Sequence, residues 1–276
     1  MSSRFSHSSG RAAKLLPHNR SSRVPPFPRE HGAWGILIGS FFSAVAVVGA
    51  ITGPMILLLL ASASLYLAHP IVLLTVRKKG DRSDRIWGMC FITLGACFLF
   101  LASMSYRPII AWSLVLPGFV LAEIILIRLR KQQSLLAHMT GMIGLAAVAP
   151  LTVILYECGV STSAGALWAA GCAFFASGIL MARYHIARMR AKSLADRVQR
   201  RDRGVLIGYH LFLAAGLLCL GLSAPSHARF IIIFLPTLVL SLLVAADRLA
   251  NISLRRIGWL IVAQTILFIL LLALIT

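Results

Sequence analysis

Residues 54–79 read PMILLLLASASLYLAHPIVLLTVRKK, an apolar run that ends in three cations. A helix needs about 20 apolar residues to cross a hydrocarbon core of roughly 30 Å. Residues 54–76 meet that length, and Arg77, Lys78 and Lys79 follow at once. The stretch therefore predicts a membrane-spanning helix whose second end meets a basic aqueous surface.

The same apolar pattern recurs along the chain after a polar beginning. Residues 1–28 are rich in Ser, Pro and Arg and have no apolar period, so we expect a disordered, basic cytoplasmic tail. Residues 29–276 are expected to form a single transmembrane helical domain, because 59% of the chain is apolar. The predicted fold class is an all-α polytopic membrane protein with about nine transmembrane helices, at 34–52, 54–76, 86–104, 109–127, 135–155, 164–182, 205–223, 229–246 and 257–275.

Lys and Arg residues lie in every other connection between these stretches. The tail holds six, and the connections after the second, fourth, sixth and eighth stretches hold five, three, eight and three. These are 25 of the 27 cations, and only Arg107 and Arg229 fall on the opposite side. Cytoplasmic loops retain Lys and Arg, so we expect the N-terminus in the cytoplasm and the C-terminus outside. The net charge of +19 then places basic loops against anionic lipid headgroups and not against nucleic acid.

Two glycine pairs have the G-x-x-x-G spacing that lets helix backbones approach closely in lipid. Gly35 and Gly39 lie on the first helix, and Gly49 and Gly53 are expected near its end. This spacing predicts close helix packing inside one bundle.

The longest connection, 183–204, joins the sixth and seventh stretches. Residues 183–190 are expected to continue a helix past the membrane surface. Asp196, Asp202 and Gly204 are then expected to cap and turn the chain into the next helix.

Ionisable side chains inside apolar helices are unfavourable by a few kcal/mol each at mid-membrane, so their depth is informative. Those within the predicted helices fall in the cytoplasmic half, whereas Glu157 and His227 belong to external loops. This distribution predicts a cavity that opens to the cytoplasm and has an apolar body, which suits an amphiphile. The polar residues in that half are His31, Trp34, His69, Glu123, His138, His185, His210 and Gln264.

The strongest local signal is the sequence PREHGAWG at 28–35. It brings Arg29, Glu30, His31 and Trp34 to the start of the first helix, where free N–H groups and the helix dipole favour an anion. An interfacial anchor would explain Trp34 and Arg29. It would not explain the carboxylate and the imidazole beside them, so we predict a functional role for this segment.

The segment PREHGAW at 28–34 resembles the P-[KR]-[EQ]-H-G-A-W opening of the YwiC-like bacterial membrane proteins. Beyond this motif the resemblance continues to residue 276 in helix pattern and loop character. It implies a multi-pass protein of the bacterial cytoplasmic (inner) membrane. The family has no settled biochemical activity, so the resemblance supplies no substrate.

The nine-helix layout also resembles that of the UbiA-type intramembrane prenyltransferases. The sequence RKQQS at 130–134, followed by Gly141, Gly144 and Ala149-Pro150, is similar to the fifth helix of that superfamily. The resemblance implies that Arg130 and Lys131 face a diphosphate.

The Asp-rich clusters that hold Mg²⁺ in those enzymes are altered in this sequence. Asp81 and Asp84 follow the second helix with i, i+3 spacing but alternate with cations, which favours a loop surface. At the second expected cluster the chain has Arg183, His185 and Arg188. Mg²⁺ requires oxygen ligands, whereas Arg binds a phosphate directly. We therefore expect no metal and no cofactor.

The predicted function is the binding of an anionic-headed amphiphile, an isoprenoid or another lipid, with metal-independent transferase chemistry left open. The expected partners are membrane lipid and an isoprenoid or diphosphate-bearing amphiphile, not nucleic acid. Glu30, His31 and His185 are the candidate catalytic residues, and the candidate substrate-binding residues are Arg29, Trp34, His69, Glu123, Arg130, Lys131, His138, Arg183 and Arg188.

Two other functions fit the same sequence. A non-enzymatic lipid or small-molecule transporter would need an opening toward the outer face and polar groups at the midplane. An accessory factor of a membrane complex would use its basic loops to bind an acidic partner, and that binding would weaken at high salt.

Overall fold

The computed structural model describes residues 31–76, 81–131, 134–190, 196–223, 228–249 and 252–275, so the predicted tail lies outside the described residues. The described residues form α-helices and no strand. In chain order the helices are α1 His31–Val48, α2 Gly53–Val76, α3 Arg82–Ser103, α4 Ile109–Ser113, α5 Val115–Arg128, α6 Leu135–Ala146, α7 Val148–Glu157, α8 Thr162–Arg190, α9 Asp196–Ser223, α10 Arg229–Ala245 and α11 Leu254–Ile275.

The predicted all-α polytopic membrane fold is confirmed for this part of the chain. Seven helical segments are long and apolar enough to cross a membrane, and two shorter apolar helices, 32–48 and 229–245, complete the nine predicted stretches. Two of the seven are each built from a pair of helices, α4 with α5 and α6 with α7.

Proline explains both of these breaks. A proline ring lacks an N–H and clashes with the carbonyl four residues earlier. Pro117 acts on Ser113, the last residue of α4, and Pro150 acts on Ala146, the last residue of α6. Each helix therefore ends there, and after one intervening residue the chain resumes as α5 or α7.

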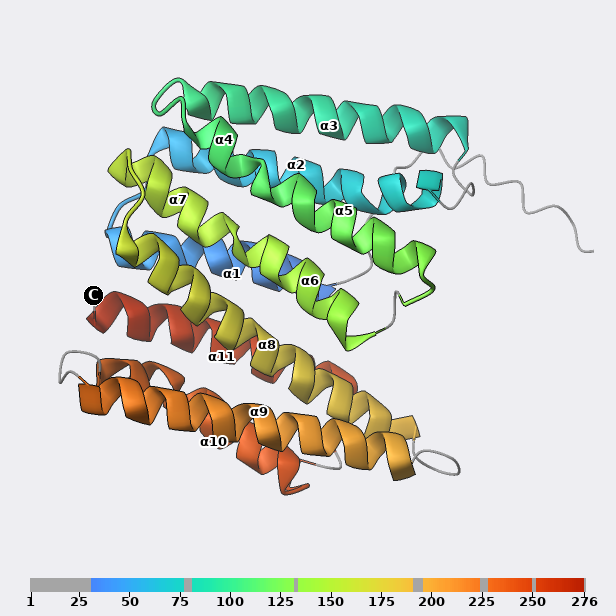
Figure 1. The fold of residues 1–276 in the computed structure, drawn as a ribbon, viewed down its shortest axis with the longest axis vertical. Coiled ribbons are helices and arrows are strands. Elements are labelled where there is room, and N and C mark those ends of the chain that lie inside the picture. Colours follow the sequence, from blue (N-terminus) through green and yellow to red (C-terminus); the bar gives the residue numbers. More distant parts are fainter. Residues whose placement is uncertain are drawn as a thin grey trace, which may run out of the picture.

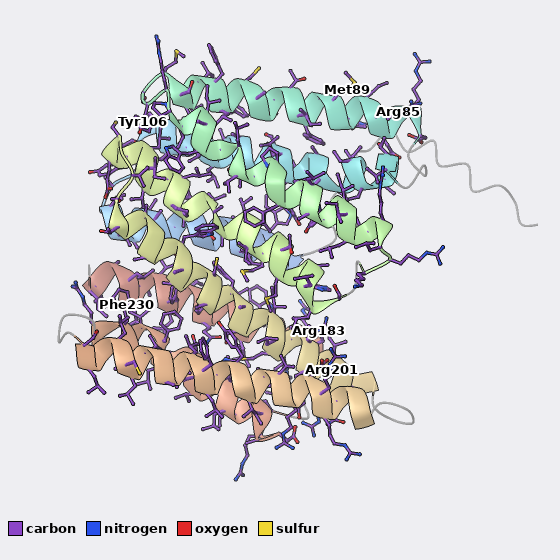
Figure 2. The ribbon with its side chains drawn as sticks, viewed as in Figure 1. Arg85, Met89, Tyr106, Arg183, Arg201 and Phe230 are labelled. Carbon is purple, nitrogen blue, oxygen red and sulfur yellow. The ribbon has the colours of Figure 1, made fainter. Side chains whose placement is uncertain are left out.

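The connections sort to two ends of the bundle, as Figure 1 shows. On the right of that view α2 ends, α3 begins, α5 ends, α6 begins, α8 ends and α9 begins. Figure 2 places Arg85, Arg183 and Arg201 at this side and Tyr106 and Phe230 at the other. We call the first side the basic end and the second the opposite end. The helix ends that flank the basic connections after α2, α5 and α8 thus lie at the same end of the bundle.

The connection between α8 and α9 differs from its prediction. Helix α8 does continue to Arg190, and its 29 residues span about 44 Å, more than the roughly 30 Å of a hydrocarbon core. Helix α9 begins at Asp196, so Asp202 and Gly204 lie inside the helix and form no turn. The predicted turn at these residues is wrong, because a single Gly is tolerated within a helix.

The centre of the bundle is α7. All eight residues from Val148 to Leu155 are buried. Helices α1, α2, α4, α6 and α8 all pack against α7. The outer helices, by contrast, expose large apolar side chains such as Phe212, Leu222 and Leu274, which are 79%, 78% and 81% exposed. Such exposure is the expected surface of a protein covered by lipid.

The first glycine pair contributes one close packing site. A Cβ on Gly39 would lie 2.9 Å from Thr265 Cγ2 of α11 and 3.1 Å from Phe175 Cζ of α8, whereas one on Gly35 would meet nothing within 4 Å. The second predicted pair is wrong: Gly49 follows the end of α1 with a positive φ of 69°, and Gly53 is the first residue of α2. Those two glycines serve the turn between two helices.

Gly39→Val should destabilise the protein by about 2 kcal/mol, because extra atoms in a packed interior typically cost 1–3 kcal/mol. Thermal unfolding in detergent, followed by tryptophan fluorescence, measures the change. Gly35→Val is the matched control, since it introduces the same side chain into the same helix where space is open. Equal losses in the two variants would contradict close packing at Gly39.

The charge sorting also makes a prediction about orientation. Green fluorescent protein fused ahead of Met1 should fluoresce, because the basic end should face the cytoplasm. Alkaline phosphatase fused after Thr276 should be active, since that enzyme folds only outside the cytoplasmic membrane. Inactive phosphatase at Thr276 together with fluorescence from a C-terminal fusion would reverse the assignment.

Candidate functional site

Charged pairs between helices lie at the basic end. In the described ranges these pairs are His69 with Glu123, Arg183 with Asp202 at 3.8 Å, and Arg188 with Asp247 at 2.7 Å. Each pair joins different parts of the chain. Two regions therefore need separate description, one around Glu123 and one around Asp247.

Glu123 lies on α5, five residues before that helix ends at Arg128, and His69 lies on α2, seven residues before Val76. Glu123 Oε2 and His69 Nε2 are in hydrogen-bond contact. Their side chains are 18% and 25% exposed, so both are largely removed from solvent and lipid. At 1.5 Å per residue, the pair lies about 8–10 Å inside the helix ends.

Helix α6 closes the other side of this carboxylate. Glu123 Oε1 lies directly against Gly141, where any side-chain carbon would collide with it. Gly144, one turn further along, similarly admits Phe119 of α5, whose Cβ would lie 2.9 Å from an added Cβ. The small residues of α6 thus let α5 approach and hold the carboxylate between α2 and α6. A carboxylate beside an imidazole can store or exchange a proton.

Trp34 approaches the same region from α1. Its ring meets that of Tyr66 edge to face, with centroids 5.0 Å apart and planes at 88°. Tyr66 precedes His69 by three residues on α2, so the two lie on neighbouring positions of one helix face. His31 is the first residue of α1, but its side chain, like Arg29 and Glu30, lies outside the described part of the structure.

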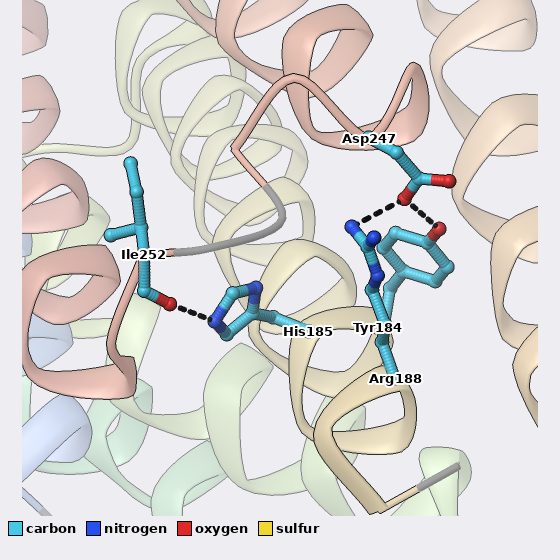
Figure 3. Close-up of polar contacts among 5 residues, drawn as sticks. All are labelled: Tyr184, His185, Arg188, Asp247 and Ile252. Atoms are coloured by element: carbon cyan, nitrogen blue, oxygen red, sulfur yellow. Dashed lines mark hydrogen bonds and ion pairs between the residues drawn. The ribbon is translucent and has the colours of Figure 1, made fainter. Parts of the chain in front are cut away.

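The second region is centred on Asp247, in the turn after α10 (Figure 3). Asp247 Oδ1 accepts a hydrogen bond from the Tyr184 hydroxyl at 2.6 Å and another from Arg188 Nη1 at 2.7 Å. Gln199 of α9 hydrogen-bonds the same hydroxyl, and Arg203 interacts with it electrostatically. We call these five residues, Tyr184, Arg188, Gln199, Arg203 and Asp247, the Asp247 cluster.

His185 lies beside the cluster but faces another partner. Its Nε2–H donates to the carbonyl of Ile252 at 2.8 Å, and the ring is 2% exposed (Figure 3). This bond ties α8 to the segment that leads into α11. One of its two ring nitrogens is therefore occupied by the backbone, and the catalytic role predicted for His185 remains a prediction.

The other predicted residues are not brought into either region by any described contact. Arg130 and Lys131 are exposed in the turn after α5, where Arg130 has a positive φ of 57°. His138 is exposed, and its Nδ1–H donates to the Ser134 carbonyl of its own helix at 2.8 Å. Arg183 pairs with Asp202 at the start of α9.

Asp81 and Asp84 have a local structural explanation. Asp81 is the N-cap of α3, and its Oδ1 accepts from the backbone N–H of Asp84 at 2.7 Å. Asp84 Oδ2 accepts in return from the backbone N–H of Asp81 at 3.2 Å. This reciprocal arrangement is a capping box, which satisfies two helix-start donors. It accounts for the i, i+3 spacing of the two aspartates.

One buried contact was not predicted from the sequence. The Ser177 hydroxyl donates to His210 Nε2 at 2.7 Å, and His210 Nδ1–H donates to the Leu206 carbonyl at 2.8 Å. The bond joins α8 to α9 deep in the protein, with Ser177 0% and His210 8% exposed. His210 was noted for its depth, but nothing in the sequence marks Ser177 as its partner.

Two hollows in the described part of the structure lie apart from the residues predicted to line a cytoplasmic cavity. One lies between α8 and α9 and is lined by residues such as Ala173, Tyr209 and Gly216. The other lies on α3 and includes Met89 and Cys97. Both are apolar, and none of the predicted site residues lines either of them.

Fold and polar contacts together define a polytopic helical membrane protein with its charged pairs at one end of the bundle. Residues 27–153 match the family model described as YwiC-like protein. The resemblance predicted from residues 28–34 is therefore confirmed over this stretch, which includes Trp34, His69, Glu123 and Gly141 and is similar to the YwiC-like proteins. Comparison with curated proteins and with solved structures gives no match. The UbiA-type resemblance stays a prediction.

The bond between His69 and Glu123 should connect α2 to α5 energetically. A double-mutant cycle with His69→Asn and Glu123→Gln should give a coupling energy of about 1 kcal/mol, the usual range for polar bonds between membrane helices. Unfolding in detergent measures each variant. Glu157→Gln, which alters a carboxylate at the opposite end, should not couple to His69→Asn. A coupling energy of zero would mean that the bond between His69 and Glu123 does not stabilise the contact between α2 and α5.

Proposed function

We propose that the protein binds an amphiphile with an anionic head group, an isoprenoid or another lipid, at the basic end of the bundle. One observation carries the proposal: the charged pairs of His69, Arg183 and Arg188 all lie at that end. The outer helices expose large apolar side chains along their length, such as Phe212 and Leu270. An amphiphile has the same division between a charged head and an apolar tail.

Exposed cations next to the Glu123 region support the placement of the head. Arg130 and Lys131 are exposed in the turn that joins α5 to α6. Apolar side chains on the same two helices are also exposed, with Ile125 at 50% and Leu136 at 61%. A tail lying along these helices would bring its anionic head to the two cations, which attract phosphate or carboxylate groups.

The pair of Glu123 and His69 would give such a site a proton donor and acceptor. Proton transfer by a positioned side chain is one requirement of metal-independent transfer chemistry. Because Glu123 is fixed between α2 and α6, the pair would meet a head group in a constant orientation. This supports the enzymatic form of the proposal, while binding alone requires only the cations.

Mass spectrometry of amphiphiles that remain bound in nanodiscs tests the proposal. The wild-type protein should retain an anionic amphiphile in excess of its share in the surrounding bilayer. The double variant Arg130→Gln with Lys131→Gln should retain several-fold less, because two charge-assisted contacts are lost.

Arg107→Gln is the control, since it removes a cation from the opposite end and should leave the retained amount unchanged. An amphiphile retained equally by all three proteins, or none retained beyond the bilayer composition, would overturn the proposal. The second outcome would favour a transporter or an accessory factor.

A further inference from the structure

The Asp247 cluster has the donor arrangement of an anion site. A single carboxylate oxygen accepts from both a hydroxyl and a guanidinium, at 2.6 and 2.7 Å (Figure 3). The two donors, Tyr184 and Arg188, lie four residues apart on α8 and so face the same direction. Hydroxyl and guanidinium donors bind phosphate oxygens in the same way as carboxylate oxygens.

The charges of the cluster do not balance. Arg188 and Arg203 contribute two positive charges, and Asp247 contributes one negative charge. A phosphomonoester carries about 1.5 to 2 negative charges and three acceptor oxygens at neutral pH, so it would match the two guanidiniums better. The Asp247 carboxylate thus carries less negative charge than the two guanidiniums could neutralise.

Asp247 lies in a turn that an anion can reach from outside. Asp247 has a positive φ of 60°, a conformation that L-residues other than Asn and Asp seldom adopt. Its side chain is 34% exposed and that of Arg188 is 27% exposed, so an anion from outside can reach both. The nearby bond from His185 to Ile252 would keep the turn beside α8 after Asp247 leaves.

We propose that the Asp247 cluster is a binding site for a phosphate group, which the Asp247 carboxylate occupies when no ligand is bound. A phosphate would displace the Asp247 carboxylate from Arg188 and Tyr184. Phosphate-bearing lipid and free phosphate share this chemistry. The identity of the ligand as an amphiphile rests on the function proposed above, but the site itself does not.

A purely structural role for Asp247 predicts a different effect of one substitution on phosphate affinity. If Asp247 only connects the turn to α8, then Asp247→Asn should weaken the connection and leave phosphate affinity unchanged or lower. If Asp247 competes with phosphate, the same substitution should raise the affinity. Asn adopts the positive φ readily, so this variant should fold.

Binding is measured on the full chain in nanodiscs of neutral phosphatidylcholine, with short-chain phosphatidic acid in one arm and inorganic phosphate in the other. Asp247→Asn should bind about five- to tenfold more tightly than the wild type, the effect expected for one charge-assisted hydrogen bond. Arg188→Gln should bind about tenfold more weakly. If Asp247→Asn binds only phosphatidic acid more tightly, the site is assigned to a lipid. If it binds both probes more tightly, the phosphate group alone is sufficient for binding.

Asp202→Asn is the matched control, because it removes the same charge from the same end of the bundle, where Asp202 pairs with Arg183 at 3.8 Å. The affinity of this variant for phosphate should stay within about twofold of the wild-type affinity. Equal tightening in Asp202→Asn and Asp247→Asn, or no tightening in Asp247→Asn, would overturn the proposal. The inorganic phosphate arm keeps this test independent of whether the protein retains an amphiphile.

Discussion

The fold depends on keeping α7 surrounded by protein. Its eight residues from Val148 to Leu155 are buried, and five other helices pack around it. In a bilayer every backbone group must find its partner within a helix, so a break in a spanning helix is tolerated where neighbouring protein covers it. The break at Pro150, between α6 and α7, lies beside this centre. Gly141 and Gly144 of α6 lie against α5, and that close approach encloses Glu123.

Much of the fold follows from the sequence, because length and apolarity decide whether a segment spans a membrane. The apolar stretches reappear in the structure, and the connections after α2, α5 and α8 meet at one end of the bundle. The bend at Pro117 has a visible cause in the sequence as well. The helix limits were less accurate where apolarity was the only guide: α9 begins at Asp196, although the apolar stretch begins nine residues later. A basic segment can be helical once it has left the membrane, and hydropathy does not register it.

The candidate site could be predicted only in part, because nearly uniform apolar helices do not fix their own rotation. The sequence placed His69 and Glu123 in the same cytoplasmic half of the bundle, but only the structure shows that they meet. Depth also selected His185, and its Nε2–H donates a hydrogen bond to the carbonyl of Ile252. Asp247 escaped notice altogether, since the sequence shows a lone acid in a basic connection and nothing of its two donors on α8.

Serine and threonine hydroxyls differ from the other polar groups in how they contribute to contacts between helices. Many Ser and Thr side chains, among them Ser43, Ser64 and Thr152, donate to the carbonyl four residues earlier in their own helix, and so add nothing between helices. Bonds that do cross between helices use other polar groups, such as the imidazole of His69, the indole of Trp168 and the hydroxyl of Tyr209. Ser177 is an exception to this pattern, because its hydroxyl donates to His210 of α9 at 2.7 Å. The carbonyl of Ala173, four residues before it, accepts from Tyr209 at 2.6 Å. Helix pairing in this bundle therefore rests on a few residues with specific partners, set within apolar surfaces that would allow many rotations.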